Sequence, residues 1–429
     1  MDLNEKIGRK TARIGVIGLG YVGLPLAVEF ARAGFDVTGF DVDATKVAEL
    51  NAGRSYILDV ATKDVADASR AGRLRATTDM SKLHDMDVVD ICVPTPLRKT
   101  RDPDLSYVVQ AVDAVKARLR RGQLVILEST TYPGTTDEVV QPALEETGLK
   151  AGEDFFLAFS PERVDPGNQA FNTRTIPKVV GGMNQRSTDL GAALYGSIID
   201  RVVPVSSTQV AEMVKLLENT FRAVNIGLVN EIALMSHRMN IDVWEVIEAA
   251  ATKPFGFMPF FPGPGLGGHC IPIDPFYLSW KARQSGFECR FIELAGQINS
   301  SMPGFVVERI GEALNTTRRA INGSRVHVFG VAYKKDVSDM RESPALDVLE
   351  LLHRRGAMLS YTDPYVPAIE HGDLSLKSVA EGEVGAVDCA VICTNHAVFD
   401  YAVMPARFPL IVDTRNALKG QTAPNIFRL

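Results

Sequence analysis

RIGVIGLGYVGLPLAVEFARAGFDVTGFD, the stretch at residues 13–41, decides the fold of this chain. Its first five residues form a short β-rich run, a glycine-rich turn follows at 18–23, and LPLAVEFARAG (24–34) has the apolar spacing of a helix. A second strand-like run, DVTGFD, ends at Asp41. The order strand, turn, helix, strand predicts one βαβ unit with parallel strands.

The glycine-rich turn has the spacing of a dinucleotide-binding turn. Gly18 permits the tight turn, Gly20 lets the backbone approach a pyrophosphate, and Gly23 lets the helix pack close to the strand. The N-terminus of the helix then faces the phosphates, and its dipole favours their charge. We therefore expect the whole turn, with Tyr21 and Val22, to bind a dinucleotide cofactor.

Asp41 lies about 20 residues beyond the turn, where a carboxylate binds the hydroxyls of the adenosine ribose. Its charge would repel the 2′-phosphate of NADP, and the next residue, Val42, is no arginine that could neutralise one. The cofactor is therefore expected to be NAD. Asp43 is the rival acidic residue at this strand end, and we interpret it as a turn or helix-start residue.

The N-terminal region continues as alternating strands and helices. Strand-like runs occur at 88–93, 124–128 and 155–159, and helix-like segments such as 105–119 separate them. This alternation predicts an α/β fold with a Rossmann-type, doubly wound parallel sheet over residues 1–205.

The pattern changes in the middle of the chain. Apolar residues spaced by three and four predict a long amphipathic helix over 210–240, and a second helical stretch covers 242–251. With the Pro/Gly-rich segment 253–275, they predict a helical connector at 206–305. A second, smaller Rossmann-like α/β domain is expected at 306–429. Its strands are predicted at 325–330, 357–362, 387–393 and 409–413, with a helix near 344–355.

Composition narrows the class of protein. A chain of 429 residues exceeds one ordinary core, and 46% hydrophobic with 23% charged residues is typical of a soluble globular protein. A net charge of −6 argues against nucleic acid or an anionic membrane as the main partner. The N-terminus lacks the apolar run of a signal peptide, and no stretch reaches the roughly 20 apolar residues of a membrane span. The cysteines form no CxxC pair, so a reducing, cytoplasmic location without a structural metal site is expected.

Cys270 is the candidate nucleophile. It lies in GGHCIPIDP (267–275), where two glycines remove steric cover from the thiol. A lone cysteine is more often a small buried hydrophobe, and Cys92, Cys389 and Cys393, which lie in strand-like runs, keep that interpretation.

The neighbours of Cys270 have simpler interpretations as well. Asp274 precedes a proline and an apolar helical run, which is typical of an N-cap, although a capping carboxylate can also orient a water molecule. His269 is interpreted as a loop residue, because adjacent residues rarely bring their side chains together as a catalytic pair.

The predicted long helix carries Lys215 and Asn219 on one face, with Arg222 at the next turn. A solvated polar stripe would give the same spacing. A cation and an amide donor beside Cys270 could instead stabilise developing oxyanions.

Seven motifs in order resemble those of one enzyme family over nearly the whole chain. They are GLGYVGLPLA (18–27), VPTP (93–96), ESTTYPGTT (128–136), SPER (160–163), KLLENTFRAVNIGLVNE (215–231), GGHCIPIDP (267–275) and YKKDVSDMRESPA (333–345). The chain thereby resembles the UDP-glucose/UDP-mannuronic-acid dehydrogenase family.

This resemblance implies a four-electron oxidation that consumes two NAD molecules in turn. The first hydride leaves C6 of a UDP-sugar, the aldehyde is trapped on Cys270 as a thiohemiacetal, and the second hydride transfer gives a thioester that water hydrolyses. By the same resemblance Lys215 and Asn219 stabilise oxyanions, Asp274 and Thr130 order the water, and one further residue, Glu162, assists acid–base steps.

The resemblance also implies binding roles. Thr95 and Thr130 would line the nicotinamide side, and Lys334 and Arg341 would meet UDP. The remaining residues expected to contact substrate are Glu162, Arg163, Lys215, Asn219 and Gly267.

SPERVDPG (160–167) and CIPID (270–274) resemble the branch acting on UDP-N-acetylhexosamines. ESTTYPGTT (128–136), ATKPFGF (251–257) and PGN (166–168) are most similar to UDP-N-acetylglucosamine 6-dehydrogenases of bacterial surface-polysaccharide pathways. UDP-N-acetylmannosamine, which differs only at C2, stays open. Two other classes also compete: a two-electron dehydrogenase of the 6-phosphogluconate type, which needs no cysteine, and a non-catalytic NAD sensor. A homodimer or higher homo-oligomer is expected, with the helix at 210–240 as its seam, unless that helix is buried between the chain's own domains.

Overall fold

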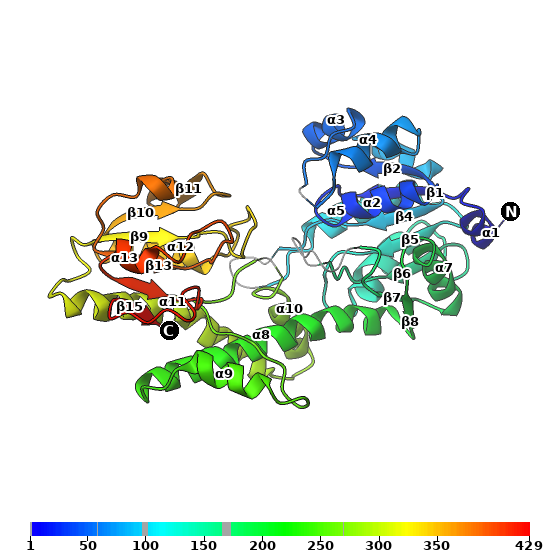
Figure 1. The fold of residues 1–429 in the computed structure, drawn as a ribbon. Helices are drawn as coiled ribbons and strands as arrows, with labels where there is room; N and C mark the ends of the chain where they lie inside the picture. The colour runs from blue at the N-terminus through cyan, green and yellow to red at the C-terminus, as the bar shows by residue number, and fades with distance from the viewer. Residues whose placement is uncertain (1, 58, 97–101, 165–172, 269) are drawn as a thin grey trace. The chain divides into compact units, whose positions relative to one another are not determined.

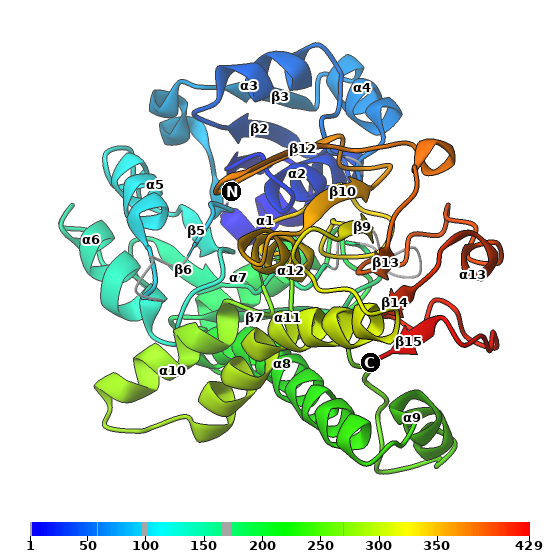
Figure 2. The ribbon, with the colours of Figure 1, turned by 90° about the vertical axis from the view of Figure 1, so that its left-hand side faces the viewer.

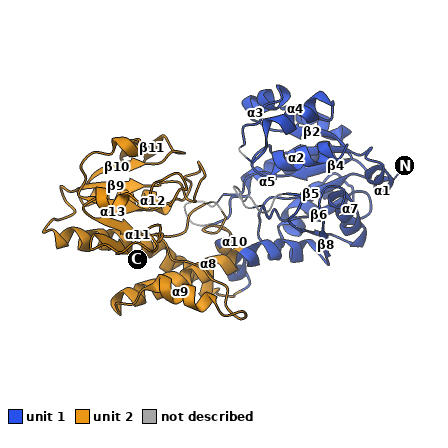
Figure 3. Cartoon of the chain, viewed as in Figure 1, with its two compact units in different colours: residues 1–218, 276–285 blue, residues 219–275, 286–429 orange. Residues whose placement is uncertain are grey.

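The computed structural model describes residues 2–57, 59–96, 102–164, 173–268 and 270–429 (Figure 1, Figure 2). The chain folds as two compact units, which Figure 3 draws in different colours. The N-terminal unit comprises Met1–Glu218 and Phe276–Ser285, and the C-terminal unit comprises Asn219–Pro275 and Gly286–Leu429.

The N-terminal unit is built on an eight-stranded sheet in the order β3-β2-β1-β4-β5-β6-β7-β8. Neighbouring strands are parallel except β6 and β7, which pair antiparallel. The predicted doubly wound sheet is thus confirmed, and its strand order reverses between β1 and β4. The strands are β1 Arg13–Ile17, β2 Asp36–Phe40, β3 Leu74–Thr77, β4 Val88–Ile91, β5 Leu124–Leu127, β6 Phe156–Phe159, β7 Lys178–Gly182 and β8 Val202–Val205.

Helices cover both faces of this sheet because its strands are apolar on both sides. In β5, Leu124 and Ile126 join the core under α1, α2 and α7, whereas Val125 and Leu127 join the core under α5 and α6. The helices are α1 Leu3–Gly8, α2 Gly23–Arg32, α3 Ala44–Asn51, α4 Thr62–Arg70, α5 Ser106–Lys116, α6 Gln141–Glu145 and α7 Gln185–Tyr195. Shorter turns are the 3₁₀ helix Met80–Asp85 and the π-helix Thr136–Val140.

The middle of the chain is helical, as predicted. The 31-residue helix α8 (Thr208–Arg238) begins in the N-terminal unit and ends in the C-terminal unit. It is followed by α9 (Val243–Ala251), α10 (Asp274–Gln284) and α11 (Arg290–Thr316). Pro303 lies inside α11, which the sequence pattern did not predict as one helix. The buried residues on both sides of this proline keep the helical spacing that packs α11 on the second sheet.

The C-terminal unit contains a five-stranded parallel sheet in the order β10-β9-β13-β14-β15, which Figure 2 shows strand by strand. Its strands are β9 Arg325–Phe329, β10 Met358–Thr362, β13 Cys389–Ile392, β14 Ile411–Asp413 and β15 Ile426–Arg428. Helix α12 (Pro344–Arg354) packs on it with α11, and α13 (Met404–Arg407) lies against its other face. A separate hairpin joins β11 (Ala368–His371) and β12 (Leu374–Lys377), and a 3₁₀ turn covers Glu381–Glu383.

The same kind of glycine turn follows the first strand of each sheet, β1 and β9. Gly18 after β1 has φ +91°, and an added Cβ there would lie 2.5 Å from the carbonyl oxygen of Cys92 after β4. Gly330 after β9 has φ +77°, and its Cβ would lie 2.1 Å from the carbonyl oxygen of Thr394 after β13. Only glycine fits either position. Across the described residues, no helix combines the length and apolar character needed to cross a membrane.

Candidate active site

The residues predicted to bind the cofactor gather at one edge of the N-terminal sheet. The glycine turn follows β1, Asp41 follows β2, Thr95 lies beyond β4, and Thr130 lies beyond β5. Glu162 lies beyond β6. Because parallel strands end at the same edge, all of these residues lie along the carboxyl edge, where doubly wound sheets bind ligands.

The geometry of the glycine turn leaves one opening. An added Cβ at Gly23 would lie 1.9 Å from the carbonyl oxygen of Gly18, so helix α2 packs directly on the turn. At Gly20 an added Cβ would meet no heavy atom of the described residues within 4 Å. The backbone at Gly20 is therefore accessible to a phosphate, beside the half-exposed Tyr21 and the first turn of α2 after Val22.

The carboxylate of Asp41 accepts a hydrogen bond from the glycine turn itself. It is only 7% exposed; its Oδ2 accepts from the backbone N–H of Leu19 at 2.9 Å, and its Oδ1 accepts from that of Asp43, also at 2.9 Å. The ammonium of Lys46 lies 3.6 Å from Oδ2. Each carboxylate oxygen has two lone pairs, so acceptor capacity remains for ribose hydroxyls. Asp43 is the N-cap of α3, as the sequence indicated.

The equivalent carboxylate of the second sheet, that of Asp363, binds groups of its own unit. Asp363 follows β10, and its Oδ2 accepts from the backbone N–H groups of Val331 and Ala332 at 2.7 and 2.9 Å. The same oxygen lies 3.0 Å from Nε2 of the buried His396. Asp363 is 2% exposed, and its Oδ2 is engaged by these three groups of the C-terminal unit.

Thr95 is held by a residue that the sequence pattern did not single out. The buried Tyr277 of α10 donates its hydroxyl to the carbonyl oxygens of Thr95 and Pro96, at 2.8 and 3.1 Å. Helix α10 thereby fixes the loop after β4.

The loop that carries Thr130 is fixed by Glu212 of α8. The backbone N–H of Gly134 donates to its Oε2 at 2.6 Å, and the backbone N–H and hydroxyl of Thr136 donate to its Oε1 at 2.9 and 2.7 Å. Glu212 is fully buried, and burial raises its pKa to about 7, although these three donors act in the opposite direction. Thr130 itself is partly buried two residues beyond Glu128.

Lys215 and Arg163 meet the loop after β6. The ammonium of Lys215 donates to the carbonyl oxygen of Glu162 at 2.5 Å, and Lys215 is only 8% exposed. Arg163 pairs with Glu218 at 2.6 Å and donates to the carbonyl oxygen of Pro177. The structure thus brings Glu162, Arg163 and Lys215 together.

The carboxylate of Glu162 enters a buried ionic cluster. Lys178 of β7 contacts the carboxylates of Glu128 and Glu162, and the hydroxyl of Tyr195 donates to Glu128 at 2.6 Å and to Asp90 at 3.0 Å. Burial raises the pKa of Asp90 to about 6 and raises that of Glu128. Burial acts in the same direction on Glu162, but the Lys178 ammonium overcomes it and lowers the pKa of Glu162 to about 2.

The cysteine loop joins helix α10. The backbone N–H groups of Ile273 and Asp274 donate to the carbonyl oxygen of Cys270 at 3.0 and 2.8 Å. Asp274 is the first residue of α10, and its Oδ2 accepts from the side-chain amide of Asn219 at 2.5 Å. Both side chains are buried. Arg222, the third polar residue of the predicted stripe, is exposed on α8.

The five cysteines differ in burial. Cys270 and Cys289 are partly exposed, whereas Cys92, Cys389 and Cys393 are buried, as predicted, and burial raises the pKa of all three thiols. A thiol with a raised pKa is a poor nucleophile near neutral pH, so exposure favours Cys270 among the predicted candidates.

The glycines before Cys270 pack on the segment 333–345. An added Cβ at Gly267 or Gly268 would lie 2.7 or 2.8 Å from the side chain of Tyr333. The backbone N–H of Gly268 donates to the carbonyl oxygen of Arg341 at 3.1 Å. Lys334 is partly buried in this segment. The YKKDVSDMRESPA motif therefore supports the cysteine loop, while His269 lies outside the described residues.

Two arginines of the C-terminal unit, Arg341 and Arg415, have different hydrogen-bond partners. Arg341 is exposed, and its Nε and Nη2 donate to Oδ1 and Oδ2 of Asp339. Arg415, beyond β14, donates to the carbonyl oxygen of Cys393 at 2.9 Å and would contact a Cβ added at Gly263. The sequence pattern did not identify Arg415, since its partners are remote in the chain.

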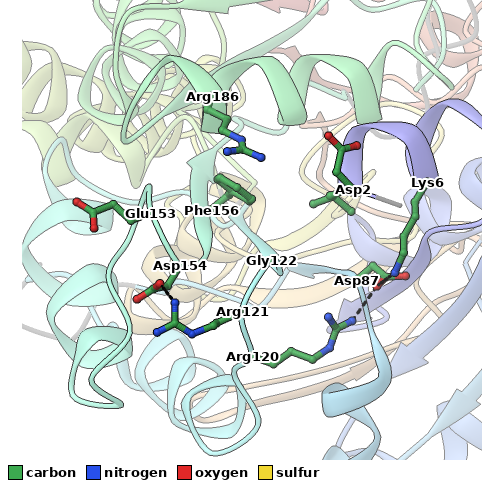
Figure 4. Close-up of a pocket in the computed structure, with 11 residues that line it drawn as sticks. Asp2, Lys6, Asp87, Arg120, Arg121, Gly122, Glu153, Asp154, Phe156 and Arg186 are labelled. Carbon is green, nitrogen blue, oxygen red and sulfur yellow. Dashed lines mark hydrogen bonds and ion pairs between the residues drawn. The ribbon is translucent and has the colours of Figure 1, made fainter.

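A pocket lies at the opposite edge of the N-terminal sheet (Figure 4). Five of its charged residues form ion pairs with one another: Lys6 and Arg120 with Asp87, and Arg121 with Asp154. The pocket faces the amino ends of β4, β5 and β6, so it is not the cofactor site predicted at the carboxyl edge.

Three consecutive segments match one family. Residues 12–199 match the NAD binding domain of the UDP-glucose/GDP-mannose dehydrogenase family, residues 209–301 its central domain, and residues 327–420 its UDP binding domain.

Individual relatives cover nearly the whole chain. The UDP-N-acetyl-D-mannosamine dehydrogenase of Pyrococcus horikoshii is 37% identical over 422 residues, which cover 97% of this chain and 98% of that protein. The UDP-N-acetyl-D-glucosamine 6-dehydrogenase of Pseudomonas aeruginosa is 37% identical over 393 residues, which cover 91% and 92%. The solved structure of the P. horikoshii UDP-D-ManNAc dehydrogenase has a TM-score of 0.89 at 36% identity and covers 97% of this chain and 98% of its own.

Proposed function

Because this chain belongs to the UDP-glucose/GDP-mannose dehydrogenase family, whose NAD-binding, central and UDP-binding domains it matches in order, we propose that it oxidises the C6 alcohol of UDP-N-acetylglucosamine to the carboxylate. NAD is its cofactor, and the open backbone at Gly20 and the acceptors of Asp41 fit that dinucleotide. The motifs around Cys270 and Glu162 support the N-acetylhexosamine branch.

UDP-N-acetylmannosamine is the second candidate substrate. Relatives named for each C2 epimer are equally similar to this chain, at 37% identity. Similarity over the whole chain therefore does not choose between the epimers, and our choice rests on the motifs ATKPFGF and ESTTYPGTT.

The proposed chemistry runs through Cys270. NAD accepts one hydride in each of two oxidation steps. After the first, the Cys270 thiolate adds to the C6 aldehyde and forms a thiohemiacetal, and loss of the second hydride gives a thioester. Water then attacks the thioester carbonyl and the C–S bond breaks, which releases the uronate, regenerates the Cys270 thiolate and yields two protons.

Four other residues serve these steps. Lys215 and Asn219, one turn apart on α8, stabilise the negative charge that develops on the C6 oxygen. Asp274 and Thr130 order the hydrolytic water. The observation that carries the proposal is the hydrogen bond from Asn219 to Asp274, whose own N–H donates to the carbonyl oxygen of Cys270. Together these two hydrogen bonds connect Asn219, Asp274 and Cys270, three of the proposed catalytic residues.

The UDP group is proposed to bind at the segment that packs on Gly267. Lys334 and Arg341 supply cations there, and a diphosphate in a protein with a net charge of −6 needs such local donors. Arg341 must first leave its pair with Asp339, whose arginine side is exposed to solvent. Arg163 is proposed to contact the sugar.

We also propose a cytoplasmic homodimer that serves surface-polysaccharide synthesis, with helix α8 as its seam. Apolar side chains exposed along α8 recur at spacings of three, four and seven, which places them in one stripe. They are Val210, Met213, Leu217, Phe221, Leu228 and Met235, and Met239 follows directly after the helix.

A panel of UDP-sugars tests the substrate. NADH formation is followed with the N-acetylated glucose and mannose derivatives and with UDP-glucose. We expect the highest kcat/KM with UDP-N-acetylglucosamine, because a pocket shaped for the acetamido group leaves polar groups unpaired when a hydroxyl replaces it. A preference for UDP-N-acetylmannosamine would reverse the epimer assignment, and a preference for UDP-glucose would overturn the branch.

A further inference from the structure

Beneath the carboxyl edge of the N-terminal sheet lie three acidic side chains and one ammonium. Asp90 is in β4, Glu128 follows β5, Glu162 lies beyond β6, and Lys178 begins β7. Asp90, Glu128 and Lys178 are at most 4% exposed. Only Glu162 was expected to have a role, so Lys178 and its partners need a separate explanation.

Lys178 is the counter-charge of this cluster. Its Nζ lies 3.1 Å from Oε2 of Glu162 and contacts the carboxylate of Glu128. Burial opposes its charge, but the two glutamates raise the pKa of Lys178, so the ammonium stays protonated. Asp90, Cys92 and Glu128 could in principle hold a metal ion, yet the Lys178 ammonium already occupies the cationic position beside Glu128.

Both carboxylate oxygens of Glu162 are therefore held by a partner. Its Oε2 faces Lys178, and its Oε1 accepts from the backbone N–H groups of Arg163 and Val164 at 2.8 and 2.6 Å. Its own carbonyl oxygen accepts from the ammonium of Lys215 at 2.5 Å. A rotation of the Glu162 carboxylate would therefore disturb the backbone that receives Lys215.

We propose that Lys178 is a positioning residue for the oxidation: by fixing the carboxylate of Glu162 it fixes the carbonyl that orients the ammonium of Lys215. This inference rests on the proposed function, in which Lys215 stabilises the oxyanion. An ammonium has three N–H donors, so the one given to Glu162 leaves two for the reacting oxygen.

Loss of Lys178 has a specific consequence. The Glu162 carboxylate would lose its buried partner and turn toward the neighbouring ammonium of Lys215, whose charge already acts on it. Lys215 would then be withdrawn from the oxyanion. Without Lys178, burial would also raise the pKa of Glu162. Other charged or titratable groups that face Glu162 or its carboxylate partners are Asp90, Cys92, Glu128, Arg163, Tyr195 and Lys215.

The test compares Lys178→Met with Lys178→Arg, which keeps the charge. Lys116→Met is the matched control, because Lys116 forms surface ion pairs with Asp113 and Glu146. For each full-length variant, thermal unfolding and NAD affinity report folding, and kcat, KM and the pH profile of kcat report function. The substrate is the UDP-sugar that wild type turns over best.

Lys178→Met is expected to lower kcat about 100-fold, as a small displacement of a catalytic group does, and to leave the NAD affinity and the KM for NAD within about twofold. Its acid limb in kcat is expected to move to higher pH by more than one unit. Lys178→Arg should keep the wild-type pH profile and most of kcat, and Lys116→Met should match wild type.

A folded Lys178→Met enzyme with the kcat and pH profile of wild type would overturn the proposal, as would a loss that Lys178→Arg does not rescue. If Lys178→Met does not fold, Lys178→Gln removes the ammonium charge at a smaller cost in stability, because its amide can still donate to the buried glutamates. It should show the shifted acid limb, and an unshifted limb would overturn the proposal. A wild-type protein that oxidises no UDP-sugar would instead refute the proposed function.

Discussion

The side-chain amide of Asn219 donates to the carboxylate of Asp274 at 2.5 Å, across 55 residues of sequence. Asn219 lies in the middle of α8, and Asp274 begins α10 directly after the cysteine loop. The hydrogen bond fixes one carboxylate oxygen, so the carboxylate has a defined orientation, and we propose that it holds the hydrolytic water.

Asp274→Ala is expected to slow hydrolysis of the thioester more than the oxidation steps, because the water loses its acceptor. We predict a kcat about 100-fold below wild type and a covalent adduct on Cys270 that mass spectrometry detects after rapid quenching. Asp242→Ala is the matched control, since Asp242 is the N-cap of α9 in the same unit. A loss of kcat without any adduct would exclude this role for Asp274.

Asp41→Ala is expected to weaken NAD binding by at least tenfold and to leave UDP-sugar binding unchanged. The variant loses the ribose acceptors and also the bond from the Leu19 N–H that shapes the turn. Asp43→Ala controls for a nearby carboxylate that only caps α3. Calorimetric titration with each ligand makes the comparison, and an equal loss of both affinities would contradict the assignment.

Glu212→Ala is expected to destabilise the N-terminal unit by about 3 kcal/mol or more, since it leaves three buried donors at Gly134 and Thr136 without their acceptor. Glu231→Ala, an exposed change on the same helix, should alter stability by less than about 0.5 kcal/mol. Urea unfolding gives both values. Equal stability of the two variants would show that Glu212 does not anchor the loop of Thr130.

His327 predicts a pH effect on the C-terminal unit. It lies between the hydroxyls of Ser360 and Thr362, at 2.8 and 3.0 Å, and burial lowers its pKa to about 4. The folded state therefore binds fewer protons than the unfolded state, and the stability from His327 is complete above pH 6.5 and is lost as pH falls through 4.

Protonation of His327 is expected to lower the free energy of unfolding by about 3 kcal/mol. Carboxylates such as Asp363 also lose stability in acid, so the difference between wild type and His327→Gln is the quantity to measure. Hydrogen exchange of the β9 and β10 amides reports it. We expect a flatter pH dependence in the variant, and parallel curves would mean that folding does not lower the pKa of His327.

The sequence allowed the first sheet to be predicted where its strands are continuous apolar runs, as at β1, β4 and β5. Strands β3, β7 and β8 were not identified, because each is short and contains a polar residue or a proline: Arg75, Lys178 or Pro204. Helix α11 was missed since Pro303 interrupts the pattern. The domain borders at 205 and 305 stay predictions.

The residues of the candidate site likewise divide into those that the sequence could identify and those that it could not. Residues inside contiguous motifs, such as Asp41 and Cys270, could be identified from spacing and resemblance, although their roles stay predictions. Lys178, Tyr277 and Tyr333 could not, because each acts on a partner far away in the chain: Tyr277, for instance, is 182 residues from Thr95. A lysine at the start of a strand looks like a surface residue until its buried partners are known.

The central claim is covalent catalysis by Cys270, and the rate of uronate release by Cys270→Ala tests it most directly. Cys289→Ala is the matched control, as Cys289 is also partly exposed. We predict that wild type and Cys289→Ala form two NADH per uronate without free aldehyde, whereas Cys270→Ala releases uronate at least about 1000-fold more slowly and forms no adduct. Uronate release by Cys270→Ala at a rate near that of wild type would contradict the account.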